Sequence, residues 1–371
     1  MRFIRYEDLD TDYGPGFEED VDAIVAEVER TVRGSAEAEG TKDAVRFAHA
    51  KPYGLLRAEV RVLPPADPAY AQGVFASPGR YPAVIRFSNG TGHVRPDVRL
   101  GSACGMAIKM FGVAGQALTD EPAAGTMDYN LINNPVFFAN TARDYVVLAR
   151  LFSELPDALA DRSRRAPWLH AFLTRDGTLP PEHWLWDELF AVLSQAGRPV
   201  PHLMHTEFWS MGALRHGDHV AKVRVVPAAE NPAAPSLPVD PLSSAHPVRE
   251  ALFEDALSAE HVFDLQVQLC TDLSTMPVEN TSVPWPERLS PFVTVARIVV
   301  PAQNLSAPDN LDRADALSFT PWRTPEEHRP VGQIQEVRRR VYERSSVLRH
   351  QLNGQPRAEP GGPDEALPPT A

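Results

Sequence analysis

The chain has 371 residues, enough for one large domain with a substantial core or for two smaller ones. A formal net charge of −13 without a sustained basic block argues against nucleic acid or an anionic membrane as the main partner. Two cysteines, Cys104 and Cys270, argue against a disulfide framework and a structural zinc cluster. Neither a signal-peptide core nor a membrane-spanning apolar run is found, so we expect a cytoplasmic protein.

The first predicted element is an amphipathic helix. Residues 17–33 place Val21, Ile24 and Val28 on one helical face, and acidic residues fill the first turn, where the helix dipole favours them. We expect residues 1–39 to form an N-terminal arm and helix, followed by one main domain over residues 40–352.

Alternating apolar and polar residues then predict a series of strands. They span residues 55–63, 83–88, 105–111, 127–138, 219–226, 261–270 and 292–300, and Pro135 should end the fourth. Residues 139–200 have helical character and interrupt the series. This pattern predicts an α+β protein built on an antiparallel barrel or sandwich with added helices. The chain contains no parallel βαβ rhythm and no dinucleotide or P-loop fingerprint.

A long predicted helix over residues 331–350 has two different faces. One is an apolar stripe of Ile334, Val337, Val341 and Leu348. Arg338, Tyr342 and Arg349 fall into a second stripe about 90° further round. Solvated arginines and a boundary tyrosine would also produce this pattern, so the helix alone does not assign a function. The tail that follows, residues 353–371, is rich in proline and glycine, and we expect it to be disordered.

Five short motifs resemble those of the haem catalases. In chain order they are Arg46-x-x-His49-Ala-Lys, Arg86-Phe-Ser88, Gly105-Met-Ala-Ile-Lys109, Asn133-x-Pro-x-Phe-Phe138 and Arg338-x-x-x-Tyr342-x6-Arg349. Their order and approximate spacing match the family over roughly residues 40–352. The resemblance implies a catalase-like antiparallel eight-stranded β-barrel with peripheral helices that binds haem b.

The resemblance also implies roles on the proximal side of the haem. Tyr342 would be the axial ligand of the iron, as catalase uses a tyrosine there. A phenol has an ordinary pKa of about 10, so a phenolate ligand needs cationic help beyond the iron, and Arg338 lies one helical turn away to supply it. Arg46, Arg86 and Arg349 would bind the haem propionates, which suits the planar fork of arginine.

On the distal side, His49 would be the general acid/base that moves a proton between the two oxygens of a peroxide. Asn133 would orient the peroxide, and Ser88 would fix the ring of His49. Each residue alone could have a structural role, as a packed histidine, a turn asparagine or a strand hydroxyl. Ala48, Phe138 and Tyr145 would complete the wall of the haem pocket.

Three departures from the family bear on the substrate. The chain ends soon after the tyrosine helix, so it resembles the minimal-core branch, without the C-terminal domain of long catalases. Ala48 stands where true catalases usually have a valine, and Tyr145 where a phenylalanine is usual. The run Asn133-Asn134-Pro135 is one residue short, so either asparagine could be the distal one, and we favour Asn133. A roomier, more polar pocket predicts a preference for organic hydroperoxides.

The resulting functional prediction is a haem-dependent, catalase-related peroxidase that acts on hydrogen peroxide, organic hydroperoxides or both. Alternatives are a hydroperoxide isomerase or dehydratase of the allene oxide synthase type, and a peroxide-driven tailoring oxidase of a biosynthetic intermediate. A barrel that binds haem without turnover is a further alternative. Relatives of catalase are commonly oligomeric, so a homo-oligomer is possible.

Overall fold

The computed structural model describes residues 2–65, 67–119, 125–196, 198–357 and 359–369. Nine antiparallel strands form one sheet in the order β5-β4-β3-β2-β1-β9-β8-β7-β6. A second pairing, between β5 and β7, closes eight of them into a barrel and leaves β6 as a short addition to β7. The predicted α+β class and eight-stranded antiparallel barrel are therefore confirmed.

The strands agree closely with the alternation in the sequence. Their bounds are β1 (Pro52–Val62), β2 (Gly79–Asn89), β3 (Cys104–Phe111), β4 (Thr126–Ile132), β5 (Phe208–Ser210), β6 (Leu214–His216), β7 (His219–Pro227), β8 (His261–Leu269) and β9 (Val293–Val300). The fourth strand ends at Ile132, three residues before Pro135. The short strands β5 and β6 were not predicted. Inward side chains of the barrel strands form the largest apolar core, with Phe87, Phe208 and Phe263 among its fully buried members.

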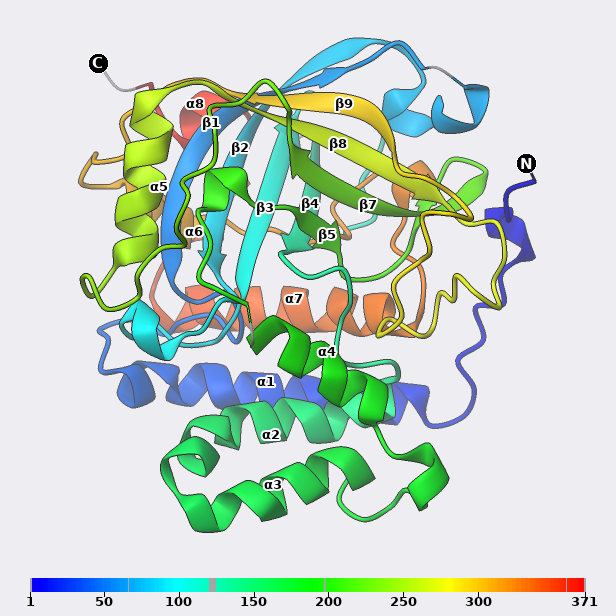
Figure 1. Ribbon diagram of the computed structural model, residues 1–371, viewed down its shortest axis with the longest axis vertical. Coiled ribbons are helices and arrows are strands. Elements are labelled where there is room, and N and C mark those ends of the chain that lie inside the picture. The colour runs from blue at the N-terminus through cyan, green and yellow to red at the C-terminus, as the bar shows by residue number, and fades with distance from the viewer. Residues whose placement is uncertain (1, 66, 120–124, 197, 358, 370–371) are drawn as a thin grey trace.

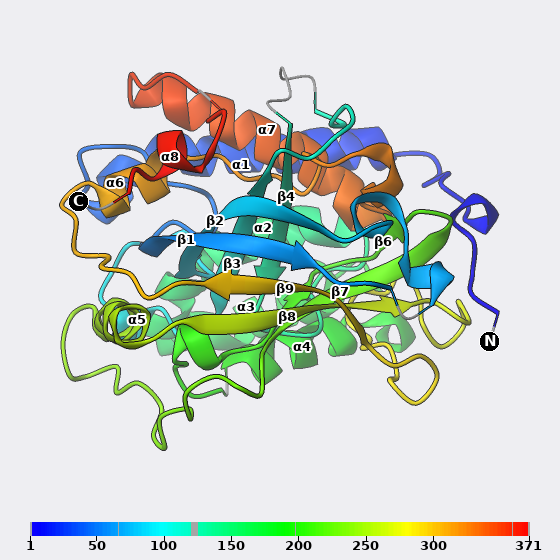
Figure 2. The same ribbon diagram turned by 90° about the horizontal axis from the view of Figure 1, so that it is seen from above.

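Helices pack around the barrel, and most of them form a layer below it in the view of Figure 1. Their bounds are α1 (Phe17–Glu39), α2 (Ala142–Ala160), α3 (Arg162–Thr174), α4 (Trp186–Ala196), α5 (Pro247–Ser258), α6 (Asn310–Ala316), α7 (Gln333–Leu352) and α8 (Pro363–Ala366). Helix α7 crosses beneath the strands, and α1 lies beyond it (Figures 1 and 2). No helix in the described part of the chain is both long and apolar enough to cross a membrane.

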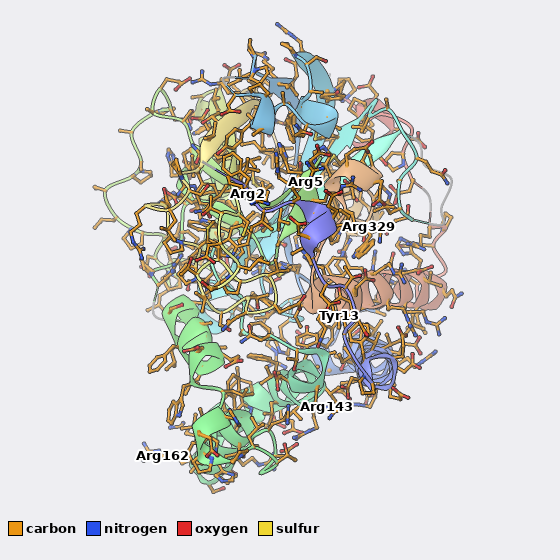
Figure 3. The ribbon with its side chains drawn as sticks, turned by 90° about the vertical axis from the view of Figure 1, so that its right-hand side faces the viewer. Arg2, Arg5, Tyr13, Arg143, Arg162 and Arg329 are labelled. Atoms are coloured by element: carbon orange, nitrogen blue, oxygen red, sulfur yellow. The ribbon has the colours of Figure 1, made fainter. Side chains whose placement is uncertain are left out.

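The helical layer is held by its own apolar cluster. Val21, Ile24 and Val28 of α1 pack against Val337 and Val341 of α7, so the stripes predicted for both helices are buried. An ion pair also joins two helices of this layer: Nε of Arg143 in α2 lies 3.1 Å from a carboxylate oxygen of Asp20 in α1. Arg143 is labelled in Figure 3. Packing of α1 and α2 thereby fixes how α7 faces the barrel.

The register of β2, β3 and β4 decides which side chains face α7. Ser88 pairs with Gly105, and Gly105 pairs with Ile132. Directly paired residues point to the same side of a sheet, and successive residues of a strand alternate. Neighbours such as Phe87 and Leu131 belong to the barrel core. Ser88, Gly105 and Ile132 therefore share the outer face of the barrel.

The C-terminal residues correct one expectation. The predicted disordered tail is instead ordered over residues 353–357 and 359–369. It contains α8, and Leu367 packs with Leu55 and Val84 on the outside of the barrel. The Glu359 carboxylate lies 2.9 Å from Lys109 Nζ and 2.8 Å from a guanidinium nitrogen of Arg323. The composition of the tail is that of a disordered segment, but its few apolar and charged residues find buried partners on the barrel.

Replacing Glu359 with glutamine should lower the free energy of unfolding by about 3 kcal/mol. Lys109, Arg323 and Asp128 are almost fully buried, with Lys109 and Arg323 each paired to both Asp128 and Glu359. Neutralising Glu359 leaves two buried cations with one carboxylate. Urea unfolding followed by circular dichroism would measure the effect, with Glu365→Gln on the exposed tail as a matched control. A loss no larger than that of the control would contradict the prediction.

Candidate active site

His49 occupies an unusual backbone position just before β1. Its φ is 58°, in the left-handed region, which few residues with a side chain adopt. Such a conformation costs about 1–3 kcal/mol and persists only where the surroundings enforce it. The loop after β2 does so: Thr91 O accepts a bond from Ala50 N, and Gly92 packs so closely that a Cβ there would lie 2.3 Å from Phe47 O.

The imidazole of His49 is held at one nitrogen. Nδ1 lies 2.7 Å from the backbone oxygen of Asn89 and 3.2 Å from the hydroxyl of Ser88. A carbonyl oxygen only accepts, so Nδ1 carries the proton, and Nε2 is left with a free lone pair. The ring fits because residue 105 is a glycine: a Cβ there would lie 2.5 Å from Nδ1. The structure therefore brings His49 and Ser88 together, as the sequence predicts.

The charge state of His49 follows from its surroundings. Desolvation is the main cause that lowers its pKa to about 4, and the positive charges of Arg86, Arg338 and Arg46 lower it further, against the effect of the Asn89 carbonyl. The imidazole is consequently neutral at neutral pH. Part of the residue nevertheless remains accessible, so His49 is half-buried rather than closed off.

Tyr342 of α7 is bonded to the arginine one turn before it. Nη2 of Arg338 donates to the Tyr342 hydroxyl over 3.2 Å, and Nη1 donates to Oε1 of Gln335 over 2.6 Å. The guanidinium is buried and stays within 5.1 Å of the tyrosine ring centroid. Arg338 also acts on the pKa of His49, so it is in electrostatic range of both residues. One cation thus connects the barrel side and the helix side of this space.

Two of the three arginines predicted to bind propionates, Arg46 and Arg86, lie at one carboxylate, that of Asp315. Nη1 of Arg46 contacts Asp315 Oδ1, and Nη2 of Arg86 lies 3.8 Å from the same oxygen. Burial lowers the pKa of Arg86 well below its ordinary value and that of Arg349 to about 9, and in both cases the charge of Arg46 lowers it further. Among described residues, Asp315 is the one carboxylate that opposes both shifts. The cluster is therefore short of negative charge.

Aromatic side chains border the same region from the helical layer. Tyr145 of α2 packs with Phe47 and Tyr342, and its ring lies 6.1 Å from that of Phe138. Burial raises the pKa of Tyr145, and the nearby hydroxyl of Tyr342 raises it further. Ala48, Phe138 and Tyr145 are all half-buried rather than closed off. They are placed where a flat, apolar group between β1 and α7 would meet them.

The prediction for Asn133 needs correction. Its amide is already engaged: Oδ1 accepts from Cys104 N over 2.8 Å, and Nδ2 donates to Ser102 O over 2.8 Å. Asn134 donates weakly to Ala191 O of α4 over 3.4 Å. The strand alternation that separates the two asparagines also separates Asn133 from Ile132, the residue paired with Gly105. The structure thus directs Ile132, rather than Asn133, to the face that carries His49.

Sequence reasoning missed Asp315, Gly105 and the backbone of Asn89 as parts of the site. Asp315 lies in an acidic, partly exposed segment where nothing in the pattern distinguishes it. Gly105 was part of a motif, but the need for glycine there could not be predicted. A side chain at residue 105 would occupy the space of the His49 imidazole, which becomes visible only when the strands are paired. The Asn89 side chain gave no signal either, although it organises the loop by bonding Lys51 N, Thr91 and His93.

The donor set fits a haem group. Two propionates would balance the positive charge that Arg46, Arg86 and Arg349 share around Asp315. The Tyr342 hydroxyl, already oriented by Arg338, is an oxygen ligand of the kind that holds ferric iron. Half-buried Phe138 and Tyr145 offer ring contacts for an apolar macrocycle.

No protein-family model matches the sequence, and no curated protein matches it. Solved structures of catalases do match its fold. A fungal catalase superposes with a TM-score of 0.63 at 16% identity and covers 86% of this chain. Catalase A from Saccharomyces cerevisiae gives 0.61 at 17% over 85%, and a bacterial catalase gives 0.60 at 15% over 92%.

The matches span 63%, 64% and 62% of those three catalases, so this chain corresponds to somewhat less than two thirds of their length. At such low identity the likeness concerns the fold and does not extend to activity. The chain has a catalase-like fold.

Proposed function

We propose that this protein is a haem-dependent peroxide-processing oxidoreductase. Its substrate would be hydrogen peroxide, an organic hydroperoxide or both. The observation that carries the proposal is the position of Arg338, which bonds Tyr342 and acts electrostatically on His49. A neutral imidazole with a free Nε2 on one element and a phenol bonded to a cation on the facing element form the two sides of a haem site.

Bound haem would supply the iron and the electrons needed to cleave the O–O bond. His49 would do the proton chemistry. Its free Nε2 accepts the proton of the hydroperoxide, and the imidazolium returns it to the departing oxygen, which leaves as water or an alcohol. The bond from Nδ1 to Asn89 O keeps the ring in the required tautomer and orientation.

The remaining residues would bind and tune the group. Tyr342 is assigned as the iron ligand, and Arg338 stabilises negative charge on its oxygen. Arg46, Arg86 and Arg349 bind the propionates, with Asp315 as a partial counterion that holds their positions. Phe138 and Tyr145 line the pocket and keep bulk water away from the reacting oxygens.

Purified protein with haem supplied during expression tests the proposal. We expect one haem b per chain by pyridine haemochrome assay and a visible spectrum of high-spin ferric, tyrosinate-ligated iron. A panel of hydrogen peroxide, tert-butyl hydroperoxide and a fatty-acid hydroperoxide should then give oxygen, oxidised co-substrate or a rearranged lipid. Protein that takes up no haem, or haem protein inert to every peroxide, would refute the proposed function.

A further inference from the structure

The wall beside the His49 ring is set by three paired strands. Ser88 of β2 pairs with Gly105 of β3, and Gly105 pairs with Ile132 at the end of β4. The ring lies over the first two, because Ser88 Oγ is 3.2 Å from Nδ1 and a Cβ on Gly105 would be 2.5 Å from it. Cβ positions of directly paired residues lie about 4.5–5.5 Å apart. Ile132 is therefore the next side chain along from the imidazole.

Ile132 is half-buried. Its strand neighbour Leu131 is closed into the barrel core, whereas Ile132 is packed in none of the apolar clusters of the described residues. Ile132 is thus an apolar side chain on the outer face of the barrel that keeps accessible area next to the ring. Ala48, the residue before His49, is likewise half-buried and small.

The two polar side chains nearest to Ile132 and the ring, those of Ser88 and Asn133, are engaged elsewhere. The hydroxyl of Ser88 is placed at Nδ1, away from the reactive Nε2. Asn133, one residue beyond Ile132, has both amide atoms bonded to the backbone of Cys104 and Ser102. In the row formed by Ser88, Gly105 and Ile132, no side chain is therefore free to hold a peroxide oxygen.

We propose that Ile132 forms an apolar wall beside His49 that selects hydroperoxides carrying a carbon substituent. The inference rests on the proposed function and narrows its substrate class. Hydrogen peroxide has two polar ends and gains nothing from contact with isoleucine. An alkyl hydroperoxide presents one O–O–H group to Nε2 and places its carbon chain against Ile132 and Ala48. Each buried methylene strengthens binding about fourfold.

Binding of alkyl isocyanides to the ferrous haem protein tests this wall without turnover. These ligands bind iron through carbon and extend an alkyl chain of chosen length into the pocket. From methyl to n-butyl isocyanide, affinity read from the Soret shift should rise about fourfold per methylene. A series with no dependence on chain length would overturn the inference.

Two variants assign the effect to the residue. Ile132→Asn should reduce the gain to below about twofold per methylene, and its amide should tighten cyanide binding to the ferric form by roughly 2- to 10-fold, the worth of one hydrogen bond. Ile132→Val keeps an apolar wall and should keep the chain-length dependence. In the peroxide panel, Ile132→Asn should shift kcat/KM from tert-butyl hydroperoxide towards hydrogen peroxide. An unchanged isocyanide series in Ile132→Asn would refute the assignment.

The two proposals fail differently. If the protein binds no haem, no Soret band exists to titrate, and the proposed function fails with this inference. If haem binds and peroxides react but isocyanide affinity is flat, the proposed function stands and the role of Ile132 falls. If Ile132→Asn folds poorly, Ile132→Ala provides the second test. This variant keeps the wall apolar but removes the contact with the alkyl chain. It should lower the affinity for n-butyl isocyanide more than the affinity for methyl isocyanide.

Discussion

Replacing His49 with alanine should lower kcat/KM for peroxide by about 100- to 10,000-fold while haem stays bound. The change removes Nε2, the atom free to take and return the proton, and leaves Tyr342, Arg338 and the three-arginine cluster in place. Stopped-flow mixing of the ferric protein with tert-butyl hydroperoxide would follow the loss directly. Haem content, measured beside it, should stay within experimental error of the wild type.

His170→Ala provides the matched control, because this histidine is exposed on α3. It should leave both peroxide reaction and haem content unchanged. His49→Gln keeps a polar group without an effective base and should be nearly as slow as alanine. A His49→Ala protein that retains more than about a tenth of the wild-type rate would exclude general acid/base catalysis by this residue.

The pH dependence of the same reaction should be flat on its acidic side. The pKa of His49 is lowered to about 4, so the neutral imidazole, which is the active base, persists as pH falls from 8 to about 5. Below that range the ring protonates, and the rate should fall as pH drops through about 4. A pH profile of kcat/KM between 3.5 and 8 measures this. An inflection near 6.5, the ordinary histidine value, would contradict the burial of the ring.

Replacing Tyr342 with phenylalanine should weaken haem binding by at least about 100-fold. Loss of a group that only supports a metal ligand lowers metal affinity by up to about 100-fold, and loss of the ligand itself should cost at least as much. The substitution removes the oxygen assigned to the iron and leaves the Arg338 guanidinium, which now bonds it, without that partner. Transfer of haem to apomyoglobin gives the rate of loss, and the charge-transfer bands of the ferric spectrum report the ligand.

Tyr81→Phe makes the same chemical change at a distance. Tyr81 lies on β2 seven residues from Ser88, roughly 23 Å along the strand. Its haem content and spectrum should equal those of the wild type. If Tyr342→Phe kept an unaltered spectrum and a wild-type rate of haem transfer, the ligand assignment would be wrong.

Periodicity alone predicted most of the barrel, because its long strands alternate over eight or more residues, as in β2 and β9. The same signal fails for β5 and β6, which have three residues each and therefore too few positions to establish a period. The prediction of a disordered tail failed for another reason. Its order depends on Glu359 and Leu367 meeting partners on the barrel surface, and composition contains no information on those partners.

For the candidate site, residue type and order selected His49, Ser88, Arg338 and Tyr342, and the structure brings His49 to Ser88 and Arg338 to Tyr342. They were insufficient at the end of β4. There a shift of one residue moves a side chain to the opposite face, so Asn133 and Ile132 exchange roles according to the strand register. That register is set by long-range pairing with β3 rather than by the local sequence.

The closure of the barrel has a consequence for how the protein is made. Strand β1 pairs with β9, with Glu59 opposite Val299, and the proposed haem site joins residues 46–49 to a helix that ends at Leu352. Contacts this distant in sequence form slowly. A ribosome adds about 5–20 residues per second, so β1 waits roughly 12–48 s for β9. Neither side of the site can capture haem before α7 has emerged, so haem insertion should follow synthesis, and chaperones should improve the yield of loaded protein.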